Sequence, residues 1–111
     1  MTRFEEIAAA LRGEFLGMAG ERAAAMKRLL ERLDAAPVDE QALGDLQLHF
    51  HNFVGSGTTY GFPGLTALGL EGERWCQERR GRALDDAERA ALHALFARVE
   101  GVLAAGRDAP S

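Results

Sequence analysis

The chain has 111 residues, of which 47% are hydrophobic and 27% are charged, and its formal net charge at pH 7 is −4. This length corresponds to a single domain, residues 1–111, that can bury a core without disulfides or metals. The acidic balance argues against nucleic acid as a partner, because a protein that binds a phosphate backbone needs a basic surface.

Features at the level of the whole chain indicate a cytoplasmic protein. Cys76 is the only cysteine, so no disulfide can form within the chain, as is usual in a reducing compartment. The acidic start, Met1 to Glu6, lacks the apolar core of a signal peptide. No segment approaches the ~20 apolar residues of a membrane span, so we expect no membrane partner.

Two apolar stripes with helical spacing occupy the first third of the chain. One covers Phe4 to Leu16, and the other begins at Glu21 and ends before Pro37, since the residue before a proline avoids the α conformation. Gly17 and Gly20 lie between the stripes. Residues 1–13 are therefore predicted as an N-terminal extension, either a separate short helix or the first turns of a long one.

Two further helices are predicted in the middle of the chain. The first begins at Asp39-Glu40, where negative charge suits the helix dipole. Its predicted buried stripe is Leu43, Leu46, Phe50, Phe53 and Val54. The next begins at Pro63, which suits a first helical turn, and ends at Arg79-Arg80-Gly81. Its predicted apolar groups are Leu65, Leu68, Leu70, Trp75 and Cys76.

The last predicted helix begins at a capping box, with Asp85 as N-cap and Glu88 three residues later. Gly106 is the predicted C-cap. Its predicted apolar stripe is Ala91, Leu92, Leu95, Phe96, Val99, Val102 and Leu103. The connections are short, which makes neighbouring helices antiparallel. The predicted fold is all-α, an antiparallel up-down-up-down four-helix bundle with a short N-terminal helical extension.

The most informative stretch runs from His51 to Gly61. His51 and Gly55 share a helical face, because positions i and i+4 lie one above the other. Glycine costs a helix about 1 kcal/mol relative to alanine, so its presence needs a reason. Without a side chain at position 55, the edge of the imidazole is accessible to a bulky partner. A run of small residues from Ser56 to Thr59 keeps the surroundings open.

This stretch, His51-Asn-Phe-Val-Gly-Ser-Gly-Thr-Thr-Tyr-Gly61-Phe-Pro63, resembles the signature of histidine-containing phosphotransfer (HPt) domains. The resemblance covers about Glu14 to Ala105. It implies that His51 accepts a phosphoryl group from the aspartate of a response-regulator receiver domain and passes it to another receiver. The protein is then a phosphorelay carrier with a phosphohistidine intermediate more than an enzyme with turnover. The neutral imidazole is a competent nucleophile near pH 7.

The resemblance also implies roles for the surroundings of His51. Glu73 matches a position that is frequently acidic in the family, and we expect it to hold Nδ1–H so that Nε2 attacks. Gly55, Ser56 and Gly61 shape the site. Val54 stands where many members have a lysine, so the site lacks that positive charge. We expect this chain to bind no cofactor, with Mg²⁺ supplied by the partner receiver.

We expect the partners to be receiver domains and a hybrid sensor kinase, bound by a monomer through Leu48, Thr58 and the neighbouring Val54 and Gly55. The alternative function is docking of a receiver or kinase without phosphoryl transfer. His49 is interpreted as a surface histidine and His93 as packed or exposed. A metal site built from the three histidines is not expected, because residues at i and i+2 point to different helical faces.

Overall fold

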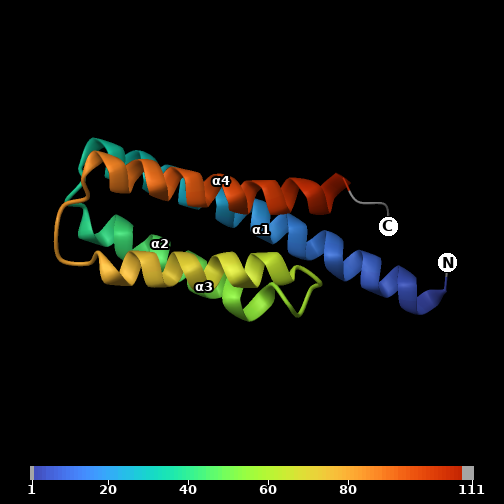
Figure 1. The fold of residues 1–111 in the computed structure, drawn as a ribbon. Coiled ribbons are helices and arrows are strands. Elements are labelled where there is room, and N and C mark those ends of the chain that lie inside the picture. Colours follow the sequence, from blue (N-terminus) through green and yellow to red (C-terminus); the bar gives the residue numbers. More distant parts are fainter. Residues whose placement is uncertain (1, 109–111) are drawn as a thin grey trace.

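A computed structural model describes residues 2–108, and within them the chain forms four helices and no strand. The helices are α1 (Arg3–Ala35), α2 (Glu40–Ser56), α3 (Pro63–Glu78) and α4 (Asp86–Asp108). Each helix packs against two neighbours: α2 and α4 both contact α1, and both contact α3 (Figure 1). The predicted all-α four-helix bundle is confirmed.

Helix α1 is one continuous helix of 33 residues. It begins at a capping box in which Thr2 Oγ1 accepts a hydrogen bond from Glu5 N at 3.1 Å, and Glu5 Oε2 accepts one from Thr2 N at 3.3 Å. Gly17 and Gly20 lie inside the helix, so residues 3–13 are its first turns and not a separate short helix. At about 1.5 Å per residue the helix is about 50 Å long, and it projects beyond the other three (Figure 1).

The core is built from the apolar faces of all four helices. Side chains that are almost completely buried include Met26, Leu30, Leu46, Phe50, Leu65, Leu92 and Val99. Cys76 is also fully buried, as predicted for a small hydrophobic residue, and burial raises the pKa of its thiol to about 12. None of the helices in the described part of the chain is long and apolar enough to cross a membrane.

Five positions of the apolar stripes predicted after Pro37 are less buried than expected. Leu70 is 41% exposed and Ala91 is exposed, while Val54, Trp75 and Val102 are half-buried. Each lies one or two positions along the chain from a buried residue of the same helix. A helix turns about 100° per residue, so these positions fall on the flank of the stripe or outside it.

The predicted C-cap at Gly106 is wrong, because α4 continues to Asp108. The glycine has a packing role instead. A Cβ added to Gly106 would lie 2.5 Å from Cε1 of Phe62 and 3.3 Å from Cδ2 of Leu16. The Phe62 ring, which also stacks on Phe15 at 5.2 Å, fills the space that this glycine leaves open. Phe62 thereby closes the end of the core at which the turn between α2 and α3 lies.

The opposite end of the bundle is held by charged side chains. The predicted capping box of α4 is confirmed: Glu88 N donates to Asp85 Oδ1 at 2.7 Å, and Asp85 N donates to Glu88 Oε1 at 3.1 Å. The Glu88 carboxylate also accepts hydrogen bonds from Arg82 at 2.6 Å and Arg79 at 3.0 Å. The hydrogen bond from Arg82 is the largest of several contacts that lower the pKa of Glu88 to about 2.

Candidate functional site

His51 lies on α2 with its imidazole directed away from the core. Its side chain is 60% exposed, whereas Phe50, one residue earlier, is fully buried. Nδ1 of His51 lies 2.9 Å from Oε1 of Glu73 on α3, and the Glu73 side chain is 25% exposed. The structure therefore brings together the two residues that the sequence analysis had paired.

The contact fixes the tautomer of the imidazole. A carboxylate only accepts hydrogen bonds, so the proton of the neutral ring must be on Nδ1, which donates it to Glu73. The lone pair of His51 is then on Nε2. Within residues 2–108, no side chain or backbone group hydrogen-bonds to Nε2 of His51. The arrangement presents an unprotonated, accessible nitrogen and holds the ring by its other nitrogen.

Two glycines on α3 bring Glu73 close enough to reach His51. A Cβ on Gly69 would lie 2.6 Å from the carbonyl oxygen of Phe50, and a Cβ on Gly72 would lie 2.2 Å from Cδ1 of the Phe50 ring. Any larger residue at either position would separate α3 from α2. This role was not predicted from the sequence, although two glycines three residues apart on a predicted helix are a signal of close helix packing.

The small residues after His51 have different roles. Gly55 is exposed, and a Cβ built there would meet no atom within 4 Å, so no contact in the described part of the chain requires a glycine. Gly57 does have an internal requirement, because its Cβ would lie 2.4 Å from Oγ1 of Thr66. Gly61 has a φ of +86°, which glycine adopts without strain. Gly57 and Gly61 are the first and last residues of the turn 57–61, and Gly55 leaves the surface beside His51 open.

The other predicted site residues lie around this surface at different depths. Leu48, one turn before His51, is 59% exposed. Val54 is half-buried, and its backbone nitrogen would lie 3.0 Å from a Cβ on Gly69 of α3. Ser56 donates its hydroxyl to the carbonyl oxygen of Asn52 at 2.9 Å. Thr58 is exposed in the turn, where its hydroxyl lies 2.9 Å from that of Thr66.

His49 differs from the surface histidine that was expected. It is half-buried, and Nη1 of Arg22 on α1 donates a hydrogen bond to its Nδ1 at 2.8 Å. Burial, followed by the nearby Arg22 charge, lowers the pKa of His49, so the neutral imidazole is favoured. Since Nδ1 accepts a hydrogen bond, the proton of this neutral ring is on Nε2, the reverse of His51.

A groove lies between α1 and α2 on this side of the molecule, with a volume of about 240 Å³. Its walls combine exposed and buried apolar groups with a few polar ones, and Phe15 stacks on Tyr60 at 4.8 Å along one side. The lining residues include Leu11, Met18, Phe53, Tyr60, Arg22, Asn52 and Ser56. This groove was not predicted, because its two walls are distant in the sequence.

The third histidine is remote from His51. His93 on α4 is exposed, and its Nε2 lies 2.8 Å from Oδ2 of Asp34 at the end of α1. Across residues 2–108, no three His, Cys, Asp or Glu side chains gather in a way that would hold a metal ion. His51 and Glu73 together place an exposed imidazole beside a carboxylate on an open helical face.

An exposed histidine held by a carboxylate on the surface of an antiparallel four-helix bundle is an arrangement suited to reversible phosphorylation. Residues 10–102 match the family model described as Hpt domain, and the chain belongs to this family. Membership supports a histidine phosphotransfer role in phosphorelays, in which Hpt domains interact with response-regulator receivers and kinases. Comparisons with curated proteins and with solved structures gave no match.

Proposed function

We propose that Nε2 of His51 accepts a phosphoryl group from the phosphoaspartate of one receiver domain and transfers it to the aspartate of another. The observation that carries this proposal is the 2.9 Å contact between Nδ1 and Glu73, which leaves the lone pair on the exposed nitrogen. The comparisons support phosphotransfer in general, and the assignment to His51 is based on this geometry.

The transfer step needs no cofactor bound to this chain. The Nε2 lone pair attacks phosphorus, the bond between phosphorus and the aspartate oxygen breaks, and the aspartate leaves as a carboxylate. The imidazole ring becomes positively charged as the N–P bond forms, and the adjacent Glu73 carboxylate stabilises that charge. The reverse steps on a second receiver return His51 to its neutral state. We expect Mg²⁺ to be bound by the acidic pocket of the receiver.

The charge that steadies the phosphoryl oxygens must come mainly from the partner. Val54 has an apolar side chain, and within residues 2–108 no Lys or Arg pairs with His51 or Glu73. Phosphoryl transfer depends chiefly on alignment and charge stabilisation, so a receiver that brings its own metal and cation can complete the site. Such a carrier transfers a phosphoryl group only when a partner that completes the site is bound to it.

We infer that partners dock over the open face of α2. Leu48 offers an exposed apolar contact on one side of His51, and Gly55 offers a flat surface on the other. Thr58 and Ser56 border the same region. A receiver or the receiver-like part of a hybrid sensor kinase fits this surface, and on the sequence evidence we place the reaction in the cytoplasm.

The experiment that tests the proposal is incubation of the protein with phosphorylated receivers. We expect an acid-labile, alkali-stable label on the wild type and no label on His51→Gln. His93→Gln is the matched control, because it removes another exposed histidine that contacts a carboxylate, and it should be labelled normally. Receivers that bind tightly to the wild type without labelling it would instead establish the docking-only function.

A further inference from the structure

Arg22 is a cation that lines the groove between α1 and α2, where it is half-buried. Its Nη1 donates to Nδ1 of His49 at 2.8 Å, and its guanidinium lies 5.9 Å from the centre of the Phe53 ring. Asp45 is near enough for its charge to affect His49. Across residues 2–108, however, no Asp or Glu forms an ion pair with Arg22. Because the imidazole of His49 is neutral, these contacts leave the positive charge of Arg22 uncompensated.

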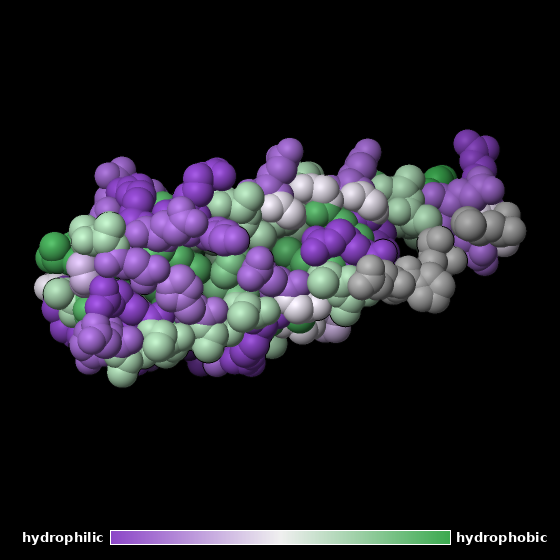
Figure 2. Space-filling model, turned by 90° about the horizontal axis from the view of Figure 1, so that it is seen from above, coloured by the Kyte–Doolittle hydropathy of each residue, from purple (hydrophilic) through white to green (hydrophobic). Residues whose placement is uncertain are grey.

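The groove also exposes apolar groups to solvent. Among its lining residues Leu11 is 48% exposed, Met18 66% and Tyr60 39%. Leu11 and Met18 are seven residues apart, which places them on one face of α1. Phe4 and Ile7 continue that face to the narrow end of the molecule, where Figure 2 shows apolar groups at the surface. Such a groove is suited to receiving an apolar side chain from another molecule.

The groove lies beside His51 on the exposed side of α2. At about 100° per residue, Gly55 and Leu48 fall between His51 and Asn52, which lines the groove. On a helix about 11 Å in diameter this arc measures about 10 Å, and Gly55 adds no side chain to obstruct it. A stable protein interface buries about 800 Å² on each partner, a patch about 30 Å across. A receiver that reaches His51 therefore also covers the groove.

Covering the groove removes water from Arg22. A guanidinium has five N–H donors, and His49 accepts from one of its nitrogens. The uncompensated charge weakens binding when it is desolvated, unless the partner supplies an acceptor. A carboxylate suits best, because its hydrogen bonds to a guanidinium are charge-assisted and can be bidentate. Glu14 also lines the groove, about 12 Å earlier along α1, and it disfavours a second acidic group at that end.

We propose that this groove is a second docking site for the receiver that exchanges a phosphoryl group with His51. It takes an apolar side chain of that receiver together with an adjacent carboxylate, which binds Arg22. The inference rests on the proposed function, because its occupant is the molecule that reaches His51. Arg22 is then a specificity-determining residue: a receiver with a neutral or basic group at this contact leaves the buried charge unpaired and is disfavoured.

Occupation of the groove can be observed directly, because Tyr60 is the only tyrosine of the chain and Trp75 the only tryptophan. Tyr60 lines the groove, whereas Trp75 lies about 160° around α3 from Glu73. Protein that contains fluorotyrosine and fluorotryptophan therefore gives one fluorine NMR signal from each side of the molecule. Addition of receivers from a purified panel should shift the Tyr60 signal and leave the Trp75 signal in place. A bound receiver that leaves the Tyr60 signal unchanged would overturn the proposal.

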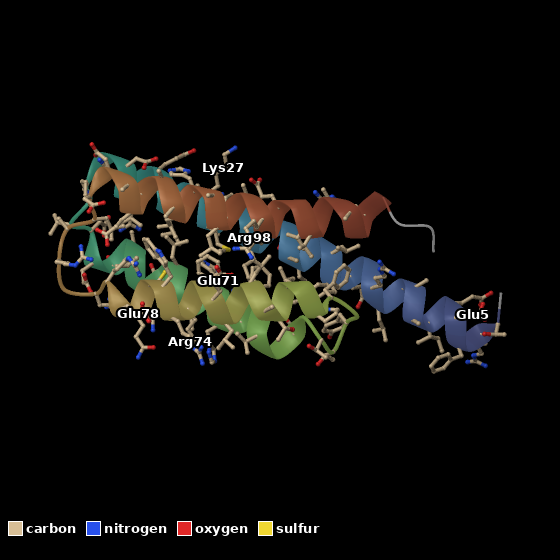
Figure 3. The ribbon with its side chains drawn as sticks, viewed as in Figure 1. Glu5, Lys27, Glu71, Arg74, Glu78 and Arg98 are labelled. Carbon is tan, nitrogen blue, oxygen red and sulfur yellow. The ribbon has the colours of Figure 1, made fainter. Side chains whose placement is uncertain are left out.

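Substitutions test the two parts of the contact. Arg22→Gln should weaken receiver binding about tenfold and make it less dependent on salt concentration. Leu11→Ser combined with Met18→Ser should also weaken binding, with unchanged helicity because both side chains are exposed. Lys27→Gln is the matched control, since it removes the same charge from α1 at a cleft against α4, where Figure 3 shows Lys27 directed away from α2 and α3. It should bind receivers like the wild type.

Binding is measured in the His51→Gln background as well, so that docking is observed without phosphotransfer. If no label forms on the wild type but Arg22→Gln still weakens binding, phosphotransfer is wrong and the groove assignment stands. Normal labelling with unchanged affinity in Arg22→Gln and in the Leu11→Ser and Met18→Ser variant would overturn the groove and leave phosphotransfer intact. Equal weakening by Arg22→Gln and Lys27→Gln would also overturn it, as would a panel of receivers of which none binds the wild type.

Discussion

Replacing Glu73 with alanine removes the side chain that, among residues 2–108, holds the His51 imidazole. A hydrogen bond to a charged group contributes about 1.5–3 kcal/mol where it is shielded from water. The Glu73 side chain is 25% exposed and the His51 side chain 60%, so we expect about 1 kcal/mol. Since about 1.4 kcal/mol corresponds to a tenfold change in rate, Glu73→Ala should slow phosphoryl transfer about fivefold.

The assay is a single-turnover measurement of transfer from a phosphorylated receiver to His51. Glu73→Gln keeps an oxygen that accepts the Nδ1 proton but loses the negative charge, so its rate should lie between those of wild type and Glu73→Ala. Glu71→Ala is the control: it removes the same charge from α3, but Glu71 pairs with Arg98 on α4 at 3.0 Å (Figure 3) and not with His51. Normal transfer by Glu73→Ala, or equal slowing by Glu71→Ala, would refute the reasoning.

Three other changes test the packing, the charges and the site. Gly72→Ala should destabilise the protein by about 1–3 kcal/mol in urea unfolding, because its Cβ would lie 2.2 Å from the buried Phe50 ring; unchanged stability would contradict the close-packing argument. Wild type should lose stability as the pH falls from about 4.5 to about 2, since the native pKa of Glu88 is lowered and the unfolded state binds the proton first. Glu88→Gln should reduce this pH dependence, and an identical pH profile would count against the assignment. Val54→Lys should leave helicity intact and prolong the phosphohistidine lifetime, and an unchanged rate of hydrolysis would show that the missing charge is unimportant.

The fold followed from the sequence because its signals are local. These signals are the apolar periodicity, Pro37, Pro63 and the Asp85 capping box, and each depends on residues close together in the chain. The periodicity indicated the helices, and the other three indicated where a helix starts or ends. The alternative left open for the first thirteen residues is resolved by the structure, in which α1 runs unbroken from Arg3 to Ala35. Gly17 and Gly20 lie inside this helix, beside the buried Phe15 and Ala19.

The parts of the site that the sequence did not predict depend on contacts between distant residues. His51 could be singled out from its own neighbourhood, and Glu73 from a family resemblance. The close approach of α3 to α2 at Gly69, and the pairing of Arg22 with His49, arise only when helices pack. Gly106 shows the same effect. A glycine near the end of a helix was interpreted as its C-cap, but in the structure it makes room for the ring of Phe62.

The most direct test of the account is to locate the phosphoryl group on the phosphorylated protein. Tandem mass spectrometry identifies the modified histidine, and heteronuclear NMR of the labelled imidazole identifies the nitrogen. We predict a phosphoryl group on Nε2 of His51, with the Nδ1 proton still hydrogen-bonded to Glu73. A phosphoryl group on Nδ1 of His51, on His49 or on His93 would contradict the account.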